Sequence, residues 1–208
     1  MFLERRKIYH YNFYILLFVR LVSSIGDRVS PIALTFAVMK LDHPVMAIGL
    51  VFSIKTIATV MFVIIGGILS DRISRKKILI VADFVRFVSQ GLTALFFLYH
   101  LQNIALLLCL QFVSGAAQGF FRPASVALLA DIVDKDHLQK ANAMINISET
   151  LPTVLGASIA AVLISVFGYA GAIAFDSISF AISCLSLSFL QIPNINEFPE
   201  SVIFAKSF

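Results

Sequence analysis

Ionisable side chains interrupt long apolar stretches of this sequence. Asp27 and Lys55 lie near the midpoints of two such stretches, 13–39 and 45–69. An ionised group near the centre of a bilayer costs at least about 2.5–3.5 kcal/mol on insertion scales, so each one needs a partner or a function. We expect Asp27 to exchange a proton in a central cavity, with Lys55 and Arg28 as neighbouring cations. Arg28 is also a candidate for a fixed ion pair with Asp27.

Other charges lie within the remaining apolar stretches or beside Asp27. Asp83 and Arg86 are spaced i and i+3, which allows an ion pair along one helix face. The others can face the same cavity or form interhelical ion pairs that stabilise a bundle, and both interpretations stay open; they are Arg20, Arg122, Glu149 and Asp176.

The composition indicates which solvent surrounds these charges. Hydrophobic residues make up 59% of the 208 residues and charged residues 13%, and the mean hydropathy is +0.93. Soluble domains have about 45–50% apolar and about 25% charged residues. A water-soluble fold of this composition would expose large apolar patches. The composition therefore predicts an integral membrane protein.

Six apolar stretches are long enough to cross about 30 Å of hydrocarbon as helices. We expect an all-α bundle over residues 13–192, preceded by a cytoplasmic N-terminus (1–12) and followed by a cytoplasmic tail (193–208). The six expected spans are 13–39, 45–69, 78–99, 104–130, 141–167 and 170–192. The glycine pair Gly115 and Gly119, and Gly156 with Ala160, have spacings that suit close helix packing.

The basic residues lie on one side of the expected spans. Nine precede the first span or lie in the loops after the second and fourth spans, whereas the opposite side has only Lys40; the nine are Arg5, Arg6, Lys7, Arg72, Arg75, Lys76, Lys77, Lys135 and Lys140. Basic clusters also occur in nucleic-acid-binding proteins, but clusters that flank membrane spans set topology. We therefore expect both termini in the cytoplasm and no nucleic-acid partner.

The loop between the second and third spans contains the most specific motif. Residues 66–77, GGILSDRISRKK, resemble the signature of the major facilitator superfamily, Gly-x-x-x-Asp-Arg-x-Gly-Arg-Arg/Lys. Gly67, Asp71, Arg72, Arg75 and Lys76 match it, and a serine, residue 74, stands at the second glycine. The resemblance implies that these five residues form a charge network that latches two halves of a transporter together.

Further segments resemble the drug:proton antiporter branch that includes macrolide-efflux proteins. They are SSIGDRVSPIAL (23–34), DFVR (83–86), FFRPASVALLADIV (120–133) and IAFDSISF (173–180). The resemblance implies one half of the fold, built from two inverted three-helix repeats, in the plasma membrane. It implies efflux of a small amphipathic drug-like compound, cationic or neutral, with a proton as coupling ion and no other cofactor. The expected partners are lipid, this substrate and a second six-helix half.

Other classes of protein fit less well. The membrane subunit of an ATP-driven transporter also has six helices, but the loop motif then has no explanation, and ATP would have to come from another chain because no Walker A sequence occurs. An intramembrane protease would need catalytic histidines or HExxH inside the spans. We expect no enzyme and no metal site. Because a second half is missing from the sequence, a truncated remnant without transport activity, a split half and a homodimer all remain possible.

Overall fold

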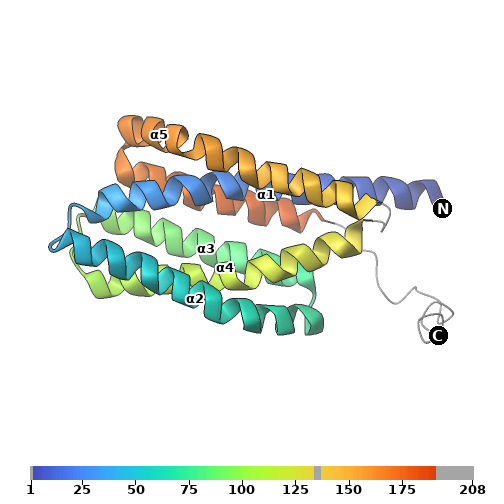
Figure 1. The fold of residues 1–208 in the computed structure, drawn as a ribbon, viewed down its shortest axis with the longest axis horizontal. Helices are drawn as coiled ribbons and strands as arrows, with labels where there is room; N and C mark the ends of the chain where they lie inside the picture. The colour runs from blue at the N-terminus through green and yellow to red at the C-terminus, as the bar shows by residue number, and fades with distance from the viewer. Residues whose placement is uncertain (1, 134–136, 191–208) are drawn as a thin grey trace.

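Long helices form most of the described chain. The computed structural model describes residues 2–133 and 137–190, and this part contains no strand. The helices run along one long axis (Figure 1); they are α1 (Phe2–Val38), α2 (Pro44–Arg72), α3 (Arg75–Leu98), α4 (Ile104–Ile132) and α5 (Leu138–Ser188). The shortest, α3, has 24 residues. At about 1.5 Å per residue it is roughly 36 Å long, enough to cross a bilayer.

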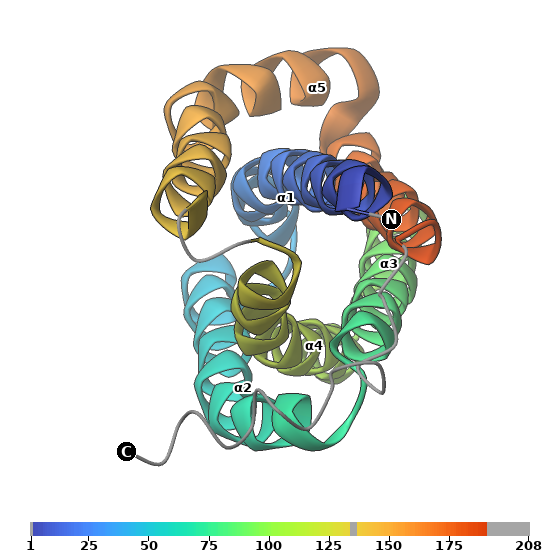
Figure 2. The same ribbon diagram turned by 90° about the vertical axis from the view of Figure 1, so that its right-hand side faces the viewer.

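The fifth helix replaces two of the predicted spans. Within α5, Gly168 has non-helical backbone angles, φ 72° and ψ 175°, which a residue without Cβ adopts readily. The chain reverses there (Figures 1 and 2), so α5 has a first arm, 138–167, and a second arm, 169–188. Six separate helices are therefore not confirmed, since the described chain has five. The predicted span 141–167 lies in the first arm, and residues 170–188 of the predicted span 170–192 lie in the second.

The ends of the helices differ from the prediction mainly at the N-terminus. The predicted first span begins at residue 13, whereas the helix α1 begins at Phe2; the cytoplasmic position of residues 1–12 stays a prediction. Residues 2–12 contain neither proline nor glycine, so nothing stops the helix from extending toward the N-terminus. The predicted tail, 193–208, lies outside the described residues.

The outer surface of the bundle is apolar. By length and composition, α2, α3, α4 and α5 are each able to cross a membrane. Large hydrophobic side chains point outward from them, such as Val45 (85% exposed) and Val154 (72% exposed). α1 is less apolar because Arg20, Asp27 and Arg28 lie near its middle. This surface suits lipid better than water.

Two hydrophobic cores lie on either side of a polar layer. Along α1, Leu16 and Val19 belong to one core, whereas Val29 and Ala33 belong to the other. Seen end-on, α1 lies between the two arms of α5, and α2 lies outside α4 (Figure 2). The charged residues of α1 therefore lie at the middle of the bundle's length, between the two cores.

Glycines allow the close contact between α2 and α4. A Cβ atom at Gly119 would lie 2.8 Å from Phe62 Cβ, and one at Gly66 would lie 2.9 Å from the Gly119 carbonyl oxygen. Gly156 of α5 is likewise pressed against α1, since its Cβ would lie 2.6 Å from Arg28 Cβ. The predicted packing at Gly119 and Gly156 is confirmed.

Neighbouring glycines of α2 provide a matched test of this packing. We expect Gly66→Val to lower the melting temperature of the detergent-purified chain by several degrees, because the new side chain meets the α4 backbone and overpacking costs about 1–3 kcal/mol. Gly67→Val is the control, since a Cβ there meets nothing within 4 Å. Equal melting temperatures of the two variants would contradict the described α2–α4 contact.

Candidate functional site

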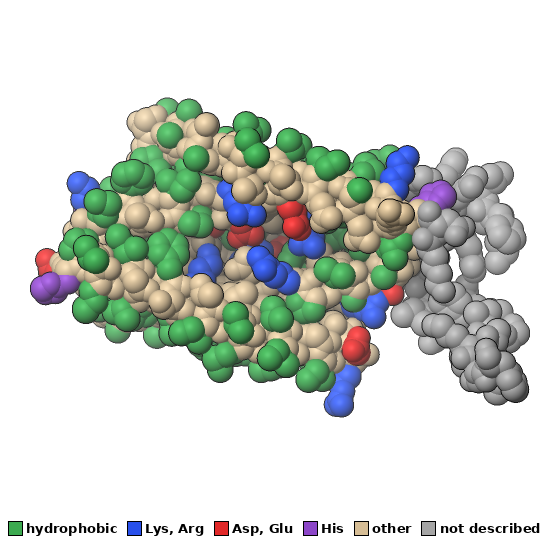
Figure 3. Space-filling model, in the orientation of Figure 1, with side chains coloured by type: hydrophobic (Ala, Val, Ile, Leu, Met, Phe, Trp, Pro, Cys, Tyr) green, Lys and Arg blue, Asp and Glu red, His purple; other side chains and the backbone are tan. Residues whose placement is uncertain are grey.

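A polar cavity of about 380 Å³ opens in the middle of the bundle. It lies between α1, α3, α4 and the first arm of α5, and charged side chains gather there on a face that is otherwise largely hydrophobic (Figure 3). Its lining residues are Arg20, Ser23, Ser24, Asp27, Arg28, Arg86, Gln118, Phe121, Arg122, Val126 and Glu149. Six of the predicted site residues are thereby brought together.

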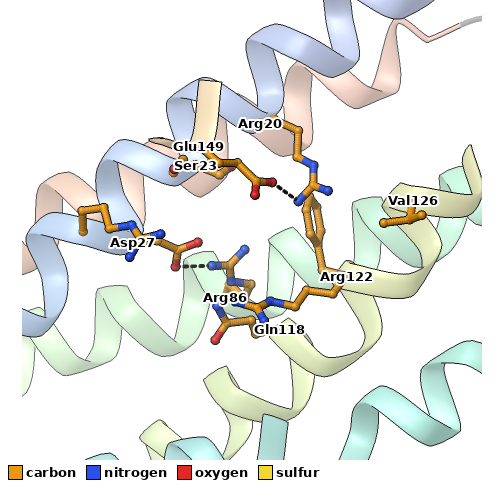
Figure 4. Close-up of a pocket in the computed structure, with 11 residues that line it drawn as sticks. Arg20, Ser23, Asp27, Arg86, Gln118, Arg122, Val126 and Glu149 are labelled. Atoms are coloured by element: carbon orange, nitrogen blue, oxygen red, sulfur yellow. Dashed lines mark hydrogen bonds and ion pairs between the residues drawn. The ribbon is translucent and has the colours of Figure 1, made fainter. Parts of the chain in front are cut away.

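Two ion pairs cross the cavity between helices (Figure 4). Arg86 Nη2 of α3 lies 2.5 Å from Asp27 Oδ1 of α1. Arg20 Nη1 of α1 lies 2.8 Å from Glu149 Oε1 of α5. Within a membrane each charge needs such a partner, since an isolated charge in a low dielectric is strongly destabilising. The closest cation to Asp27 is therefore Arg86, and not its neighbour Arg28.

Arg86 bridges two carboxylates. Its side chain is 3% exposed, and its Nη1 lies 3.5 Å from Asp83 Oδ1, so the predicted i, i+3 pair is confirmed. The guanidinium carbon also lies 3.8 Å from the centre of the Phe180 ring, a favourable cation–π distance. Asp83 is fully buried and accepts a hydrogen bond from the Ser183 hydroxyl. Arg86 and Asp83 thus tie α1 and α3 to the second arm of α5.

Asp176 is held away from the cavity. It is 1% exposed, and its Oδ2 accepts a hydrogen bond of 2.8 Å from Gln90 Nε2. Gln90 also donates to the Ser30 hydroxyl at 2.9 Å. Asp176 Oδ1 has no hydrogen-bond partner among the described residues. Asp176 therefore belongs to a buried polar contact between α1, α3 and α5.

Lys55 also lies outside the cavity lining. Its side chain is partly buried, and it makes no ion pair within the described part of the chain. Asp27 and Asp176 are both close enough to influence it electrostatically. Lys55 is therefore a neighbouring cation, as predicted, but it is not a wall of the cavity.

Arg28 and Arg122 complete the cavity lining without an ion-pair partner among the described residues. Both are exposed side chains, Arg28 on α1 and Arg122 on α4. Arg122 lies near enough to Arg20 for the two positive charges to repel. The lining thus has four arginines and two carboxylates.

The loop motif lies at one end of the bundle, far along α2 and α3 from the cavity. Arg75 forms an ion pair with Asp131 at the end of α4 and donates to the Ala127 carbonyl at 3.0 Å. Arg75 Nη2 lies 3.9 Å from Asp71 Oδ1, which is farther than Arg75 lies from Asp131, and the Asp71 side chain is 76% exposed. Arg72 is exposed at the last turn of α2. Gly67 faces open space.

Lys76 joins the loop motif to α5. Its ammonium group donates to the carbonyl oxygens of Ser188 (2.8 Å) and Leu190 (2.7 Å). These carbonyls lie at the C-terminal end of the second arm, where helix carbonyls lack helical partners. Lys76 therefore caps this helix end.

Sequence reasoning missed several of these partners. Asp131 lies in the segment 120–133, which resembles the antiporter branch. A carboxylate at this end of the fourth predicted span, on the same side of the membrane as the basic loop, was a usable signal for a partner of Arg75. Phe180, Ser183 and Gln90 gave no such signal, because polar or aromatic residues inside apolar helices are common and only the packing selects them.

Two adjacent lysines test the helix cap. We expect Lys76→Met to speed backbone hydrogen exchange at 185–190 about tenfold, since the last carbonyls of α5 lose a charged hydrogen-bond donor worth about 1.5–3 kcal/mol. Lys77→Met is the control, because Lys77 is exposed and makes no hydrogen bond with a described residue. Unchanged exchange in the Lys76→Met variant would rule out the cap.

The comparisons with known proteins point to one family. The family model described as Major Facilitator Superfamily matches residues 16–202. The chain is 32% identical to the MFS-type transporter YkuC of Bacillus subtilis, over 88% of this chain and 42% of that protein. It is 21% identical to macrolide efflux protein A of Streptococcus pyogenes, over 96% of this chain and 49% of that protein.

A solved structure has the same fold. The POT family transporter PepTSo superimposes with a TM-score of 0.76 at 15% identity, covering 85% of this chain and 36% of that protein.

The chain spans about half the length, or less, of these relatives. A transporter family agrees with the prediction that the chain is not an enzyme. The apolar helices agree with the predicted membrane protein. The family model covers most of the sequence and names the same family that the loop motif resembles. This chain is a membrane protein that belongs to the major facilitator superfamily.

Proposed function

We propose that this chain forms one wall of the substrate cavity in a secondary transporter. The transporter exports a small amphipathic, drug-like compound in exchange for a proton. The observation that carries the proposal is the polar cavity between two apolar cores, with the Asp27–Arg86 ion pair across it at 2.5 Å. Charges at this depth are costly in a protein that only needs to span a bilayer. The efflux proteins among the relatives support the direction of transport.

The proton step uses Asp27. A proton on the Asp27 carboxylate removes its negative charge, and the ion pair with Arg86 is then weakened. Arg86 keeps its second carboxylate, Asp83, so its own charge stays compensated. The contact between α1 and α3 therefore changes strength with protonation, which is what coupling a proton to a rearrangement of helices requires.

The membrane arrangement that goes with this function has six spans. The two arms of α5 each cross once, so that α1–α3 and α4–α5 form two inverted three-helix repeats. Both termini lie in the cytoplasm, and the protein resides in the plasma membrane. A second six-helix half supplies the opposite wall of the cavity, because substrate in such transporters binds between two halves.

The loop motif serves as the latch between the halves. Asp71 is exposed, and a side chain at Gly67 would meet nothing within 4 Å, so this surface is open to an opposing helix end. Arg75 is already held by Asp131, and Lys76 caps α5. The motif therefore ties α2, α3, α4 and α5 together on the side that meets the second half.

Cysteine labelling tests the topology. In a background in which Cys109 and Cys184 are replaced by alanine, we expect a membrane-impermeant maleimide to label His43→Cys and Asn103→Cys in intact cells. We expect it to miss Ser74→Cys until the cells are permeabilised, because the basic loop faces the cytoplasm. Labelling of Ser74→Cys in intact cells would reverse the proposed orientation.

Everted membrane vesicles that contain the chain with its second half test the function. We expect an imposed pH gradient, acid inside, to drive accumulation of an amphipathic fluorescent dye, and a proton ionophore to abolish it. Accumulation that needs ATP and ignores the ionophore would instead favour the membrane subunit of an ATP-driven transporter.

A further inference from the structure

We infer that the compound held in this cavity carries a carboxylate or phosphate group, and that Arg28 and Arg122 bind it. The inference rests on the proposed function, whose site it uses, and it names the charge of the ligand. The sequence led us to expect a cationic or neutral compound. The charges that line the cavity favour an anion.

The charges of the lining do not balance. Four arginines line the cavity, Arg20, Arg28, Arg86 and Arg122, against two carboxylates, Asp27 and Glu149. Each carboxylate already has an arginine, at 2.5 Å for Asp27 and 2.8 Å for Glu149. Four positive charges minus two negative charges leave a net charge of +2, on Arg28 and Arg122.

Nearby groups reduce this excess but do not remove it: with Asp83, Asp176 and Lys55 included, five positive charges face four negative charges, which leaves a net charge of +1. Asp83 lies behind Arg86 and is occupied by it and by Ser183. Asp176 is turned away toward Gln90, and Lys55 adds another positive charge near Asp27. Arg122 and Arg86 both repel Arg20. An anion bound at Arg122 would offset its repulsion with Arg20 in a site of low dielectric.

The shape and chemistry of the cavity fit a small organic anion. Guanidinium groups are planar and bind carboxylate or phosphate through paired hydrogen bonds. Arg122 reaches the same space as Arg86 and Gln118 (Figure 4). Phe121 and Val126 give the lining an apolar part, and about 380 Å³ lies within the usual range of small-molecule pockets. An aromatic or aliphatic acid matches both the arginines and the apolar part of the lining.

Binding of a matched set of probes tests the inference. The full chain is reconstituted in nanodiscs of phosphatidylcholine, and equilibrium dialysis measures binding of 2-naphthoate, naphthyl phosphate, 2-naphthamide and 2-naphthylmethylamine. We expect saturable binding of the two anions, at least tenfold tighter than binding of the amide or the amine. Arg28→Gln and Arg122→Gln should each weaken anion binding about tenfold, while Lys40→Gln, at an exposed lysine outside the cavity, should not.

The results separate the alternatives. Amine binding as tight as naphthoate binding, or naphthoate binding that survives the Arg28→Gln/Arg122→Gln double variant, would overturn the inference. Circular dichroism checks that the variants are folded, and Arg28→Lys with Arg122→Lys should keep part of the affinity because the charge remains. Competition by added phosphatidylglycerol would assign the anion to a lipid phosphate, whereas the absence of competition would assign it to a soluble compound.

The same samples keep this inference apart from the proposed function. Anion binding in nanodiscs needs no proton gradient and no transport. If the vesicles transport but the probes show no preference for anions, only the inference fails. If the probes show the preference and the vesicles do not transport, only the proposed function fails.

Discussion

Replacement of Arg86 by methionine should destabilise the bundle more than any other single substitution in the polar layer. The Arg86 side chain is 3% exposed, and its guanidinium compensates two carboxylates, Asp27 at 2.5 Å and Asp83 at 3.5 Å. Removing one partner of a buried ion pair costs about 3–5 kcal/mol, because the remaining charge stays buried without compensation. Asp83 is fully buried and cannot turn to water. We expect the Arg86→Met chain to melt well below the wild type in detergent, or to aggregate.

A second substitution distinguishes loss of charge compensation from loss of packing. Arg86→Met/Asp83→Asn removes the fully buried negative charge together with the arginine, so it should recover a large part of the lost melting temperature. Lys40→Met, at an exposed lysine, should melt like the wild type. If Arg86→Met alone melts within about a degree of the wild type, Arg86 does not carry the contacts described here.

Replacement of Asp27 by asparagine should keep the fold and abolish proton coupling. Asp27 is partly exposed to the cavity, with 28% of its side chain accessible. Arg86 retains Asp83 in this variant, so no buried charge is left alone. The asparagine side chain is a neutral amide and cannot take up or release a proton near neutral pH. In liposomes with the second half present, we expect substrate export by Asp27→Asn to proceed at the same rate with and without a pH gradient.

The wild type should export substrate several-fold faster when the proton gradient drives protons in the direction opposite to substrate movement than when no gradient is present. Asp42→Asn is the matched control, because Asp42 lies in the loop between α1 and α2 and is exposed. That variant should respond to the gradient like the wild type. Undiminished gradient-driven export by Asp27→Asn would remove Asp27 from the mechanism.

Much of the fold follows from local features of the sequence. Apolar runs of more than 20 residues and the basic loop at 72–77 located α2, α3 and α4 to within a few residues, because a span must be apolar along its whole length. The predicted end of one span at 167 and start of the next at 170 also bracket the reversal at Gly168. Gly168 is the residue of α5 with non-helical backbone angles, and a helical arm lies on each side of it.

The partners across helices were less predictable. Spacing revealed Asp83 and Arg86 because they lie on one helix, whereas Asp27 and Arg86 are 59 residues apart and meet only through the packing of α1 on α3. The loop motif assigned Gly67 to the latch and gave no indication that its neighbour Gly66 makes a close contact with α4. Adjacent residues of a helix point about 100° apart, so the choice between them depends on which way the helix is turned.

Proton movement driven by substrate tests the central claim most directly. The chain and its second half are reconstituted in liposomes that contain a pH-sensitive dye, with equal pH on both sides and a gradient of the compound that the vesicles accumulate. We predict that movement of the compound in one direction drives protons in the other, and that the dye reports this for the wild type and not for Asp27→Asn. Movement of the compound by the wild type without any change in luminal pH would contradict the account.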